Sequence, residues 1–134
     1  MLVESEESMA VQSAEDVVRV RQEVRTCATK LGFSLVDQTK IVTAASEIAR
    51  NTLIYGGGGT LKVQLLRNGA RLGLRLIFED QGPGIPDVQR ALSDGYTSGN
   101  GLGLGLGGAK RLSNEFEIES TPGRGTRVIL GRWT

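Results

Sequence analysis

Apolar residues recur with helical spacing in the N-terminal part of the chain. The first such stretch begins at Ser13, which forms a capping-box pattern with Asp16, and it stops at Gly32. Its apolar positions fall on one helical face: Val17, Val20, Val24, Ala28 and Leu31. Three arginines lie off that face: Arg19, Arg21 and Arg25. The pattern predicts an amphipathic helix whose arginines form either a solvated face or a docking surface for an acidic partner.

A second helix is predicted to begin at Ser34, again with an acidic residue, Asp37, three positions later. The positions expected to be buried share one face: Ile41, Ala44 or Ala45, Ile48, Thr52 and Tyr55. The helix is expected to end at a run of four glycines, residues 56–59, which is typical of a C-cap and turn.

Strand patterns dominate the remainder of the chain. Runs at 61–67 and 71–79 are joined by Asn68-Gly69, the dipeptide most typical of a tight β-hairpin. Two further strands are predicted at 116–120 and 126–132, and short helices near 87–93 and 106–113. This order predicts an α+β fold in a single domain over residues 1–134. In it, a two-layer sandwich places helices over one face of a mixed, mainly antiparallel sheet.

The first residues carry the weakest pattern. Residues 1–8 are expected to be disordered, with a short strand near residues 9–12. The apolar residues Leu2, Val3, Met9 and Val11 leave a second interpretation open, namely an edge strand that pairs across a dimer.

Composition narrows the classes of function. The 134 residues carry a net charge of +1 and only 4% aromatic residues, so nothing favours a nucleic-acid partner, which would need a basic face and stacking aromatics. The absence of histidine excludes Ser-His and Cys-His catalysis, and the single Cys27 excludes an internal disulfide. No apolar run of 18 residues occurs, so no membrane partner is expected and the predicted location is the cytoplasm.

Residues 99–108 read GNGLGLGLGG. Glycine at this density admits a close approach to the backbone, most often by a phosphate chain, whereas the alternative is a flexible linker. The leucines between the glycines argue against a linker. The spacing Gly103, Gly105 and Gly108 matches a dinucleotide fingerprint, but no strand precedes it, and a P-loop pattern is absent.

Three polar residues are candidates for chemistry. Glu47 and Asn51 are four residues apart on the second helix and share one face, so a carboxylate base and an amide ligand for Mg²⁺ would lie together. A solvated helix face is the competing interpretation. Asp80 ends a predicted strand, where it is either an Asx-turn residue or an acceptor for an amino group such as that of adenine.

Four motifs in order resemble those of the GHKL nucleotide-binding superfamily. Residues 46–51 (SEIARN) are similar to its N box, and residues 79–85 (EDQGPGI) to its first glycine box. Residues 99–108 are similar to its second glycine box, and residues 125–128 (GTRV) to its closing strand motif. The resemblance covers about residues 10–133 and is strongest to the anti-sigma-type serine/threonine kinases, the group that includes the stressosome switch kinases.

The resemblance implies a role for each matching position. Glu47 would be the general base and Asn51 the Mg²⁺ ligand. The nucleotide-binding positions would be Asp80, Gly82, Gly84, Gly99, Gly101, Leu102, Gly103, Gly105, Lys110 and Thr126. The role of Arg50, between the base and the metal ligand, stays open.

The resemblance also implies a function: an ATP- and Mg²⁺-dependent serine/threonine kinase that phosphorylates STAS-domain scaffold or antagonist proteins of a stressosome-like complex. Such a kinase then switches to a second partner, such as a phosphatase or another output enzyme. The alternative is a nucleotide-gated, anti-sigma-type binding module with little or no phosphotransfer. Glu47 favours the kinase, because a pure binding module needs no base at that position.

Overall fold

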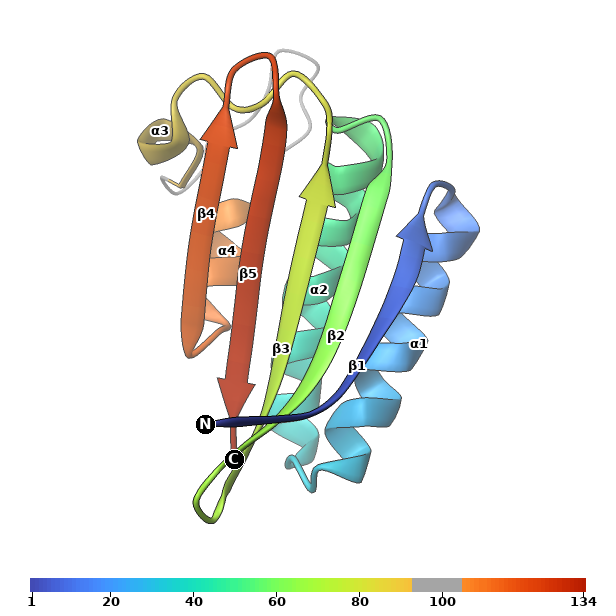
Figure 1. Ribbon diagram of the computed structural model, residues 1–134, viewed down its shortest axis with the longest axis vertical. Helices are drawn as coiled ribbons and strands as arrows, with labels where there is room; N and C mark the ends of the chain where they lie inside the picture. Colours follow the sequence, from blue (N-terminus) through green and yellow to red (C-terminus); the bar gives the residue numbers. More distant parts are fainter. Residues whose placement is uncertain (93–104) are drawn as a thin grey trace.

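The computed structural model describes residues 1–92 and 105–134, in which five strands form one sheet (Figure 1). The strands are β1 (Leu2–Val11), β2 (Gly59–Asn68), β3 (Arg71–Asp80), β4 (Glu115–Thr121) and β5 (Gly125–Trp133). Their order in the sheet is β1-β2-β3-β5-β4, and each neighbouring pair is antiparallel. The predicted α+β class is confirmed, although the parallel pair that a mixed sheet would contain is not found among the described strands.

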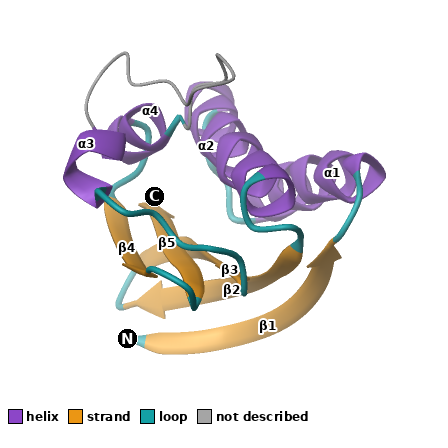
Figure 2. Cartoon of the chain, turned by 90° about the horizontal axis from the view of Figure 1, so that it is seen from above, coloured by secondary structure: helices purple, strands orange, loops and turns teal. Residues whose placement is uncertain are grey.

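The helices lie against one face of this sheet (Figure 2). They are α1 (Ala14–Lys30), α2 (Leu35–Ile54), α3 (Val88–Leu92) and α4 (Leu106–Arg111). Ser13 and Ser34 begin the two long helices as predicted, because each hydroxyl accepts a hydrogen bond from the backbone N–H three residues later, at 3.2 and 3.1 Å.

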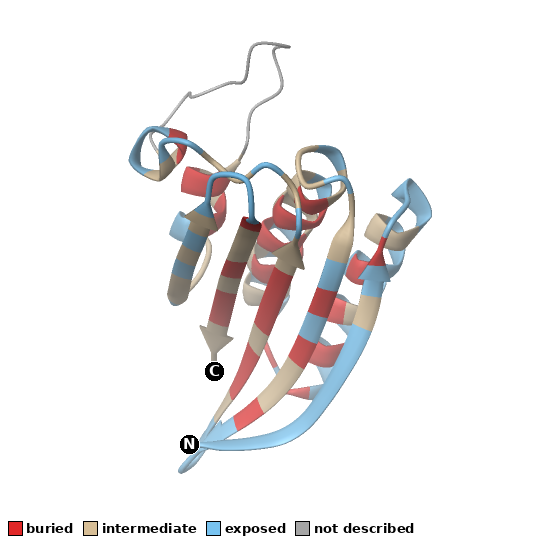
Figure 3. Ribbon diagram, turned by 45° about the horizontal axis from the view of Figure 1, so that its top comes forward, coloured by how far each residue is buried: buried red, intermediate tan, exposed pale blue. Residues whose placement is uncertain are grey.

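The core fills the space between the helices and the sheet. Alternation along β3 buries Leu74, Leu76 and Phe78 on the helix side. Opposite them, α2 contributes Ile41 and Ile48, which are almost fully buried (Figure 3). One face of α2 is therefore fixed in the core, and the residues on its other face are held in place by that burial.

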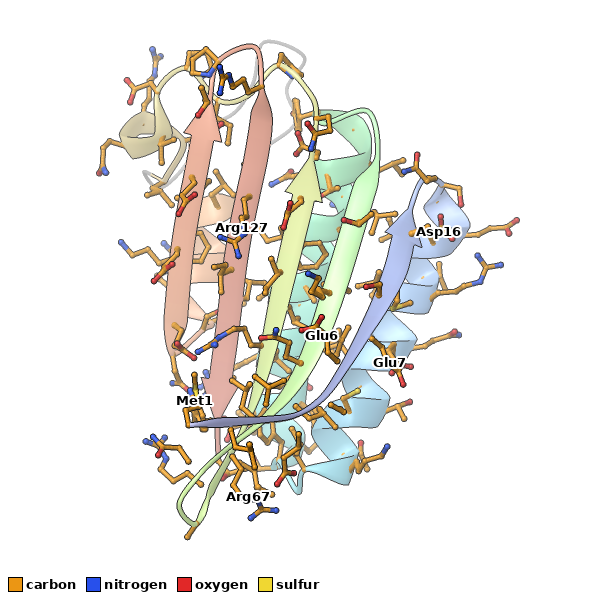
Figure 4. All side chains as sticks on the ribbon, viewed as in Figure 1. Met1, Glu6, Glu7, Asp16, Arg67 and Arg127 are labelled. Atoms are coloured by element: carbon orange, nitrogen blue, oxygen red, sulfur yellow. The ribbon has the colours of Figure 1, made fainter. Side chains whose placement is uncertain are left out.

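The prediction that residues 1–8 are disordered is wrong, because residues 2–8 belong to β1. The strand pairs with β2 of the same chain from Leu2 opposite Arg67 to Val11 opposite Gly59. Its side chains stay exposed over most of its length, so the strand lacks the alternation of buried apolar residues by which a strand is predicted from sequence. The strand is held instead by backbone hydrogen bonds and by cross-strand ion pairs of Glu4 with Arg67 and of Glu6 with Lys62. Figure 4 labels one member of each pair, Arg67 and Glu6.

Arg132 connects β5 to α2 and to the residue that follows α4. The Arg132 guanidinium of β5 donates to the Leu112 carbonyl, after α4, at 2.9 Å and to the Asp37 carboxylate of α2 at 2.8 Å. Its side chain is only 13% exposed. Since the hydrogen bond from Arg132 favours the charged carboxylate, it lowers the pKa of Asp37 below the ordinary value of 3.8.

Replacement of Asp37 tests this connection. A lowered pKa in the folded state contributes stability that is present above pH 3.8 and is lost as the pH falls through the folded-state value. We therefore expect Asp37→Asn to lower the melting temperature by a few degrees at pH 7, with a difference from wild type that shrinks below pH 4. Thermal unfolding followed by circular dichroism between pH 2.5 and 7 measures this difference. Glu117→Gln, at an exposed position of β4, is the control, and a constant difference across this range would contradict the assignment.

Candidate functional site

A pocket of about 180 Å³ lies where the C-terminal end of α2 meets the ends of β3 and β5. Its polar lining comes from Asn51, Asp80 and Thr126, while Ile85 and Leu106 are among its apolar walls. An apolar pocket with a few converging polar groups is the usual form of a small-molecule site. The pocket thus brings together three of the residues that the sequence singled out from separate motifs.

Asp80 is the only carboxylate that lines this pocket among the described residues. One carboxylate oxygen accepts a hydrogen bond from the Gly82 N–H at 2.9 Å. Burial raises the pKa of Asp80 above 3.8, while hydrogen bonds from the Gly82 and Thr126 backbone act in the opposite direction. The Asx-turn interpretation is therefore correct, and the same carboxylate also faces the pocket.

Gly56 allows α2 to approach Asp80. A Cβ atom at position 56 would overlap the Asp80 carboxyl carbon, so any larger residue would displace the acid. From the sequence, Gly56 was expected only to end α2 as part of a C-cap, and its role beside Asp80 was not predicted. The run of four glycines at 56–59 is the feature of the sequence from which a close approach of two backbone segments could have been expected.

Thr126 belongs to a small hydrogen-bonded group at the side of the pocket. Its hydroxyl lies 2.8 Å from the Ser120 hydroxyl of β4, which also accepts a hydrogen bond from the Ile85 N–H at 2.6 Å. Ser120 thereby ties the segment after β3 to the last hairpin. Sequence reasoning missed this residue, which only the pairing of Ser120 with Thr126 in the sheet reveals.

Glu47 lies in a second hollow, of about 400 Å³, between α2 and α4. Asn51 and Tyr55 line both this hollow and the pocket at Asp80, so the two are contiguous. The side chain of Glu47 is 34% exposed, and its carboxylate lies 3.5 Å from the Arg50 guanidinium. The arginine whose role was open therefore pairs with Glu47 while remaining half-exposed.

Gly105 brings the start of α4 against Glu47. Its φ of +66° is a backbone conformation that other residues rarely adopt, and a Cβ atom there would collide with the Glu47 carboxylate. The backbone at Gly105 therefore approaches the carboxylate closely on one side. Gly105, one glycine of the 99–108 run, thus lies directly beside the glutamate of the N-box motif.

The remaining predicted positions have different outcomes. Gly82 and Gly84 lie in the loop after β3, and Gly84 lines the pocket. Lys110 is exposed in the last turn of α4 and is not among the residues that line either hollow. Four predicted positions lie outside the described residues: Gly99, Gly101, Leu102 and Gly103.

One amide oxygen at the junction of the two hollows is compatible with Mg²⁺ as a ligand-bound ion. Among the described residues, no cluster of three acidic, cysteine or histidine side chains is suited to enclose a metal ion. Asn51 offers one amide oxygen at the junction of the two hollows. Mg²⁺ commonly takes one or two protein oxygens and completes its shell with water and substrate phosphates, so this sparse donor set suits it.

Comparison with known proteins identifies the family. Residues 36–133 match the family described as Histidine kinase-, DNA gyrase B-, and HSP90-like ATPase. The chain belongs to this ATPase family. The resemblance to GHKL proteins expected from the four motifs is therefore confirmed. None of the helices within residues 1–92 and 105–134 has the length and apolarity needed to cross a membrane.

Within the family, the chain is similar to proteins of one functional group. It is 45% identical to the serine/threonine-protein kinase RsbT of Bacillus subtilis over 88% of this chain and 89% of that protein. It is 32% identical to the anti-sigma F factor of Clostridium novyi over 82% and 80% of the respective chains. By family and by similarity, the chain is therefore of the serine/threonine-protein kinase type.

Solved structures agree on the fold. The structure of the RsbU and RsbW domains of Rv1364c from Mycobacterium tuberculosis superposes with a TM-score of 0.63 at 20% identity, over 96% of this chain and 32% of that one. The mycobacterial sensor histidine kinase MprB gives 0.56 at 20% identity, over 96% and 97%.

The half-buried carboxyl of Asp80 predicts a change in the stability of the ligand-free protein. A carboxyl whose pKa is raised by folding destabilises the folded state at pH values above its pKa, because its charged form is the less favourable one there. We expect Asp80→Asn, which keeps an acceptor for the Gly82 N–H, to raise the melting temperature at pH 7. The gain should disappear below pH 4.

Thermal unfolding without nucleotide measures this effect, and Asp37→Asn is the matched control of opposite sign. A lower melting temperature for Asp80→Asn at pH 7 would show that the carboxylate stabilises the empty pocket.

Proposed function

We propose that this protein is an ATP- and Mg²⁺-dependent serine/threonine kinase that phosphorylates STAS-domain proteins of a stressosome-like complex in the cytoplasm. The observation that carries the proposal is the contiguity of the two hollows, with the acceptor Asp80 in one and the carboxylate of Glu47 in the other. Membership in the ATPase family and the similarity to a serine/threonine-protein kinase support it.

The pocket at Asp80 suits an adenine ring. The carboxylate accepts a hydrogen bond from the exocyclic amino group, and Thr126 supports that side, directly or through water. Ile85 and Leu106 contact the ring faces, and the backbone of Gly84 lines the pocket beside them. Along the triphosphate we assign Gly99, Gly101, Leu102, Gly103 and Gly105, with Lys110 as an added cation.

Asn51 is assigned to hold Mg²⁺ through its side-chain oxygen, at the junction between adenine and Glu47. A bound Mg²⁺ ion neutralises phosphate oxygens and fixes their orientation, which phosphoryl transfer requires. The protein contributes a fixed position for this donor, because the opposite face of α2 is buried in the core.

We assign Glu47 the role of general base, which takes the proton from the substrate hydroxyl. The Ser or Thr hydroxyl donates it to the carboxylate as the new bond from that oxygen to the γ-phosphorus forms. The bond from the γ-phosphorus to its bridging oxygen breaks, and ADP leaves. The Arg50 guanidinium and the backbone of Gly105 lie beside the carboxylate, and we assign to them the positioning of Glu47 for the acceptor.

A second function is favoured by one observation, the similarity to anti-sigma F factor. In that function the protein binds a partner according to its nucleotide state and transfers little phosphate. The two functions combine in partner switching, in which phosphorylation of the first partner releases the kinase to a second one, such as a phosphatase or another output enzyme.

Phosphotransfer to a hydroxyl is the direct test. With labelled ATP, Mg²⁺ and a STAS-domain protein encoded nearby, we expect acid-stable label on a serine or threonine of that protein, identified by mass spectrometry. Bound ATP without acid-stable label would leave the binding module as the function.

Two substitutions separate binding from transfer. We expect Glu47→Gln to reduce the transfer rate by about 10²–10⁴-fold with nucleotide affinity unchanged, because it removes only the base. Asp80→Asn should weaken nucleotide binding by roughly tenfold or more. The reason is that a neutral amide oxygen accepts a weaker hydrogen bond from the adenine amino group than a carboxylate does. Calorimetric titration with an ATP analogue and initial transfer rates measure the two effects. Equal behaviour of the two variants would refute this division of roles.

A further inference from the structure

Ser120 is not among the residues that line the pocket at Asp80, but it contacts two residues that are. It is a half-buried residue of β4 on the same side of the strand as Ile118, which packs against the core, so its side chain faces the helices. The Ser120 hydroxyl is hydrogen-bonded to Ile85 and to Thr126. Both of these residues line the pocket, so one hydroxyl reaches the pocket through two of its walls.

The bond with Ile85 determines how the Ser120 hydroxyl is used. The Ile85 N–H donates to Ser120 Oγ at 2.6 Å, and a backbone N–H can act only as a donor. Ser120 is therefore the acceptor in this bond and keeps its own hydrogen for another partner. Loss of the hydroxyl would leave the Ile85 N–H without this acceptor and would remove a link between the loop after β3 and β4.

The distances favour Thr126 as the partner for that hydrogen. The two hydroxyl oxygens of Ser120 and Thr126 are 2.8 Å apart, which is the usual O–H···O separation. The Gly125 carbonyl lies 3.3 Å from Ser120 Oγ, beyond the usual range, so it competes weakly. When Ser120 donates to Thr126, the hydrogen of the Thr126 hydroxyl is available to a ligand in the pocket.

A donor at Thr126 complements the acceptor at Asp80. The two residues lie directly opposite each other in the pairing of β3 with β5, and the Thr126 backbone also donates to the Asp80 carboxylate. The pocket then offers an acceptor and a donor side by side. Adenine presents the matching pair on one edge, with a donor at its exocyclic amino group and an acceptor at the neighbouring ring nitrogen N1.

We infer that Ser120 is a positioning residue for base recognition, which orients the Thr126 hydroxyl so that it donates to ring nitrogen N1 of adenine. The inference rests on the proposed function, because that function places adenine in this pocket. It adds a residue outside the lining of the pocket and assigns a direction to the hydrogen bond of Thr126. Ser120 acts only through Thr126 and Ile85.

Two ligands that differ at N1 test this direction. The affinity for ADP with Mg²⁺ is compared with that for 1-deaza-ADP, in which a C–H group replaces N1, by calorimetric titration. We expect wild type to bind ADP about fivefold more tightly, as one hydrogen bond would give. In Ser120→Ala this preference should fall below twofold, because Thr126 has lost the partner that orients it. A loosened wall at Ile85 would weaken both ligands alike and leave the preference unchanged.

Thr126→Val removes the oriented hydroxyl itself and should also abolish the preference for ADP. Addition of Ser120→Ala to this variant should change the preference no further, because Ser120 acts on N1 only through Thr126. If Ser120→Ala is unfolded at the temperature of the titration, Ser120→Cys takes its place, since a thiol is only a weak donor and acceptor.

Ser113→Ala is the matched control. Ser113 is also a half-buried serine, its hydroxyl donates to the Ala109 carbonyl at 2.8 Å, and it lines neither the pocket at Asp80 nor the hollow at Glu47. This variant should keep the preference of wild type.

Binding of ADP with no preference in wild type, or with an unchanged preference in folded Ser120 variants, would overturn this inference and leave the kinase proposal standing. A further change on adding Ser120→Ala to Thr126→Val would overturn it as well. No binding of ADP by wild type would overturn both.

Discussion

Close contact between backbone segments around the Asp80 carboxylate is the constraint on which the site depends. The end of α2 and the loop after β3 meet there, at Gly56 and Gly82, with spacing that leaves no room for a Cβ atom at either position. Because the segments touch, the carboxylate at the end of β3 lies directly beside the helix that carries Asn51 and Glu47. Under the proposed function, a wider junction would separate the residue that accepts a hydrogen bond from adenine, Asp80, from Asn51 and Glu47.

Helix α2 links this junction to the rest of the molecule. One of its faces is buried against the sheet through residues such as Ile41 and Ile48, and another carries Glu47 and Asn51 toward the two hollows. At 3.6 residues per turn, side chains four apart stay on one face. Burial in the core therefore sets the rotation of α2 about its axis, and this rotation directs Glu47 and Asn51 toward the two hollows.

Much of this arrangement was predictable from sequence because it follows local rules. Serine caps, the Asn68-Gly69 turn and helical periodicity located the main helices and strands, and the four motifs located Glu47, Asn51 and Asp80. Features that depend on pairing between distant segments were not predictable. Strand β1 is held by partners on β2 rather than by its own apolar residues, and Ser120 gains its role only from its neighbour Thr126. The contact between Gly105 and Glu47 likewise needs three dimensions to be seen.

The raised pKa of Asp80 has a consequence for the lifetime of the protein. A carboxylate kept partly dry in an empty pocket costs stability, and a ligand that donates a hydrogen bond to it relieves that cost. Any such ligand stabilises the folded chain by mass action. Under our assignment of an adenine nucleotide to this pocket, resistance to proteolysis would rise with occupancy of the site by ATP or ADP, so that turnover of the protein would follow the total supply of adenine nucleotide.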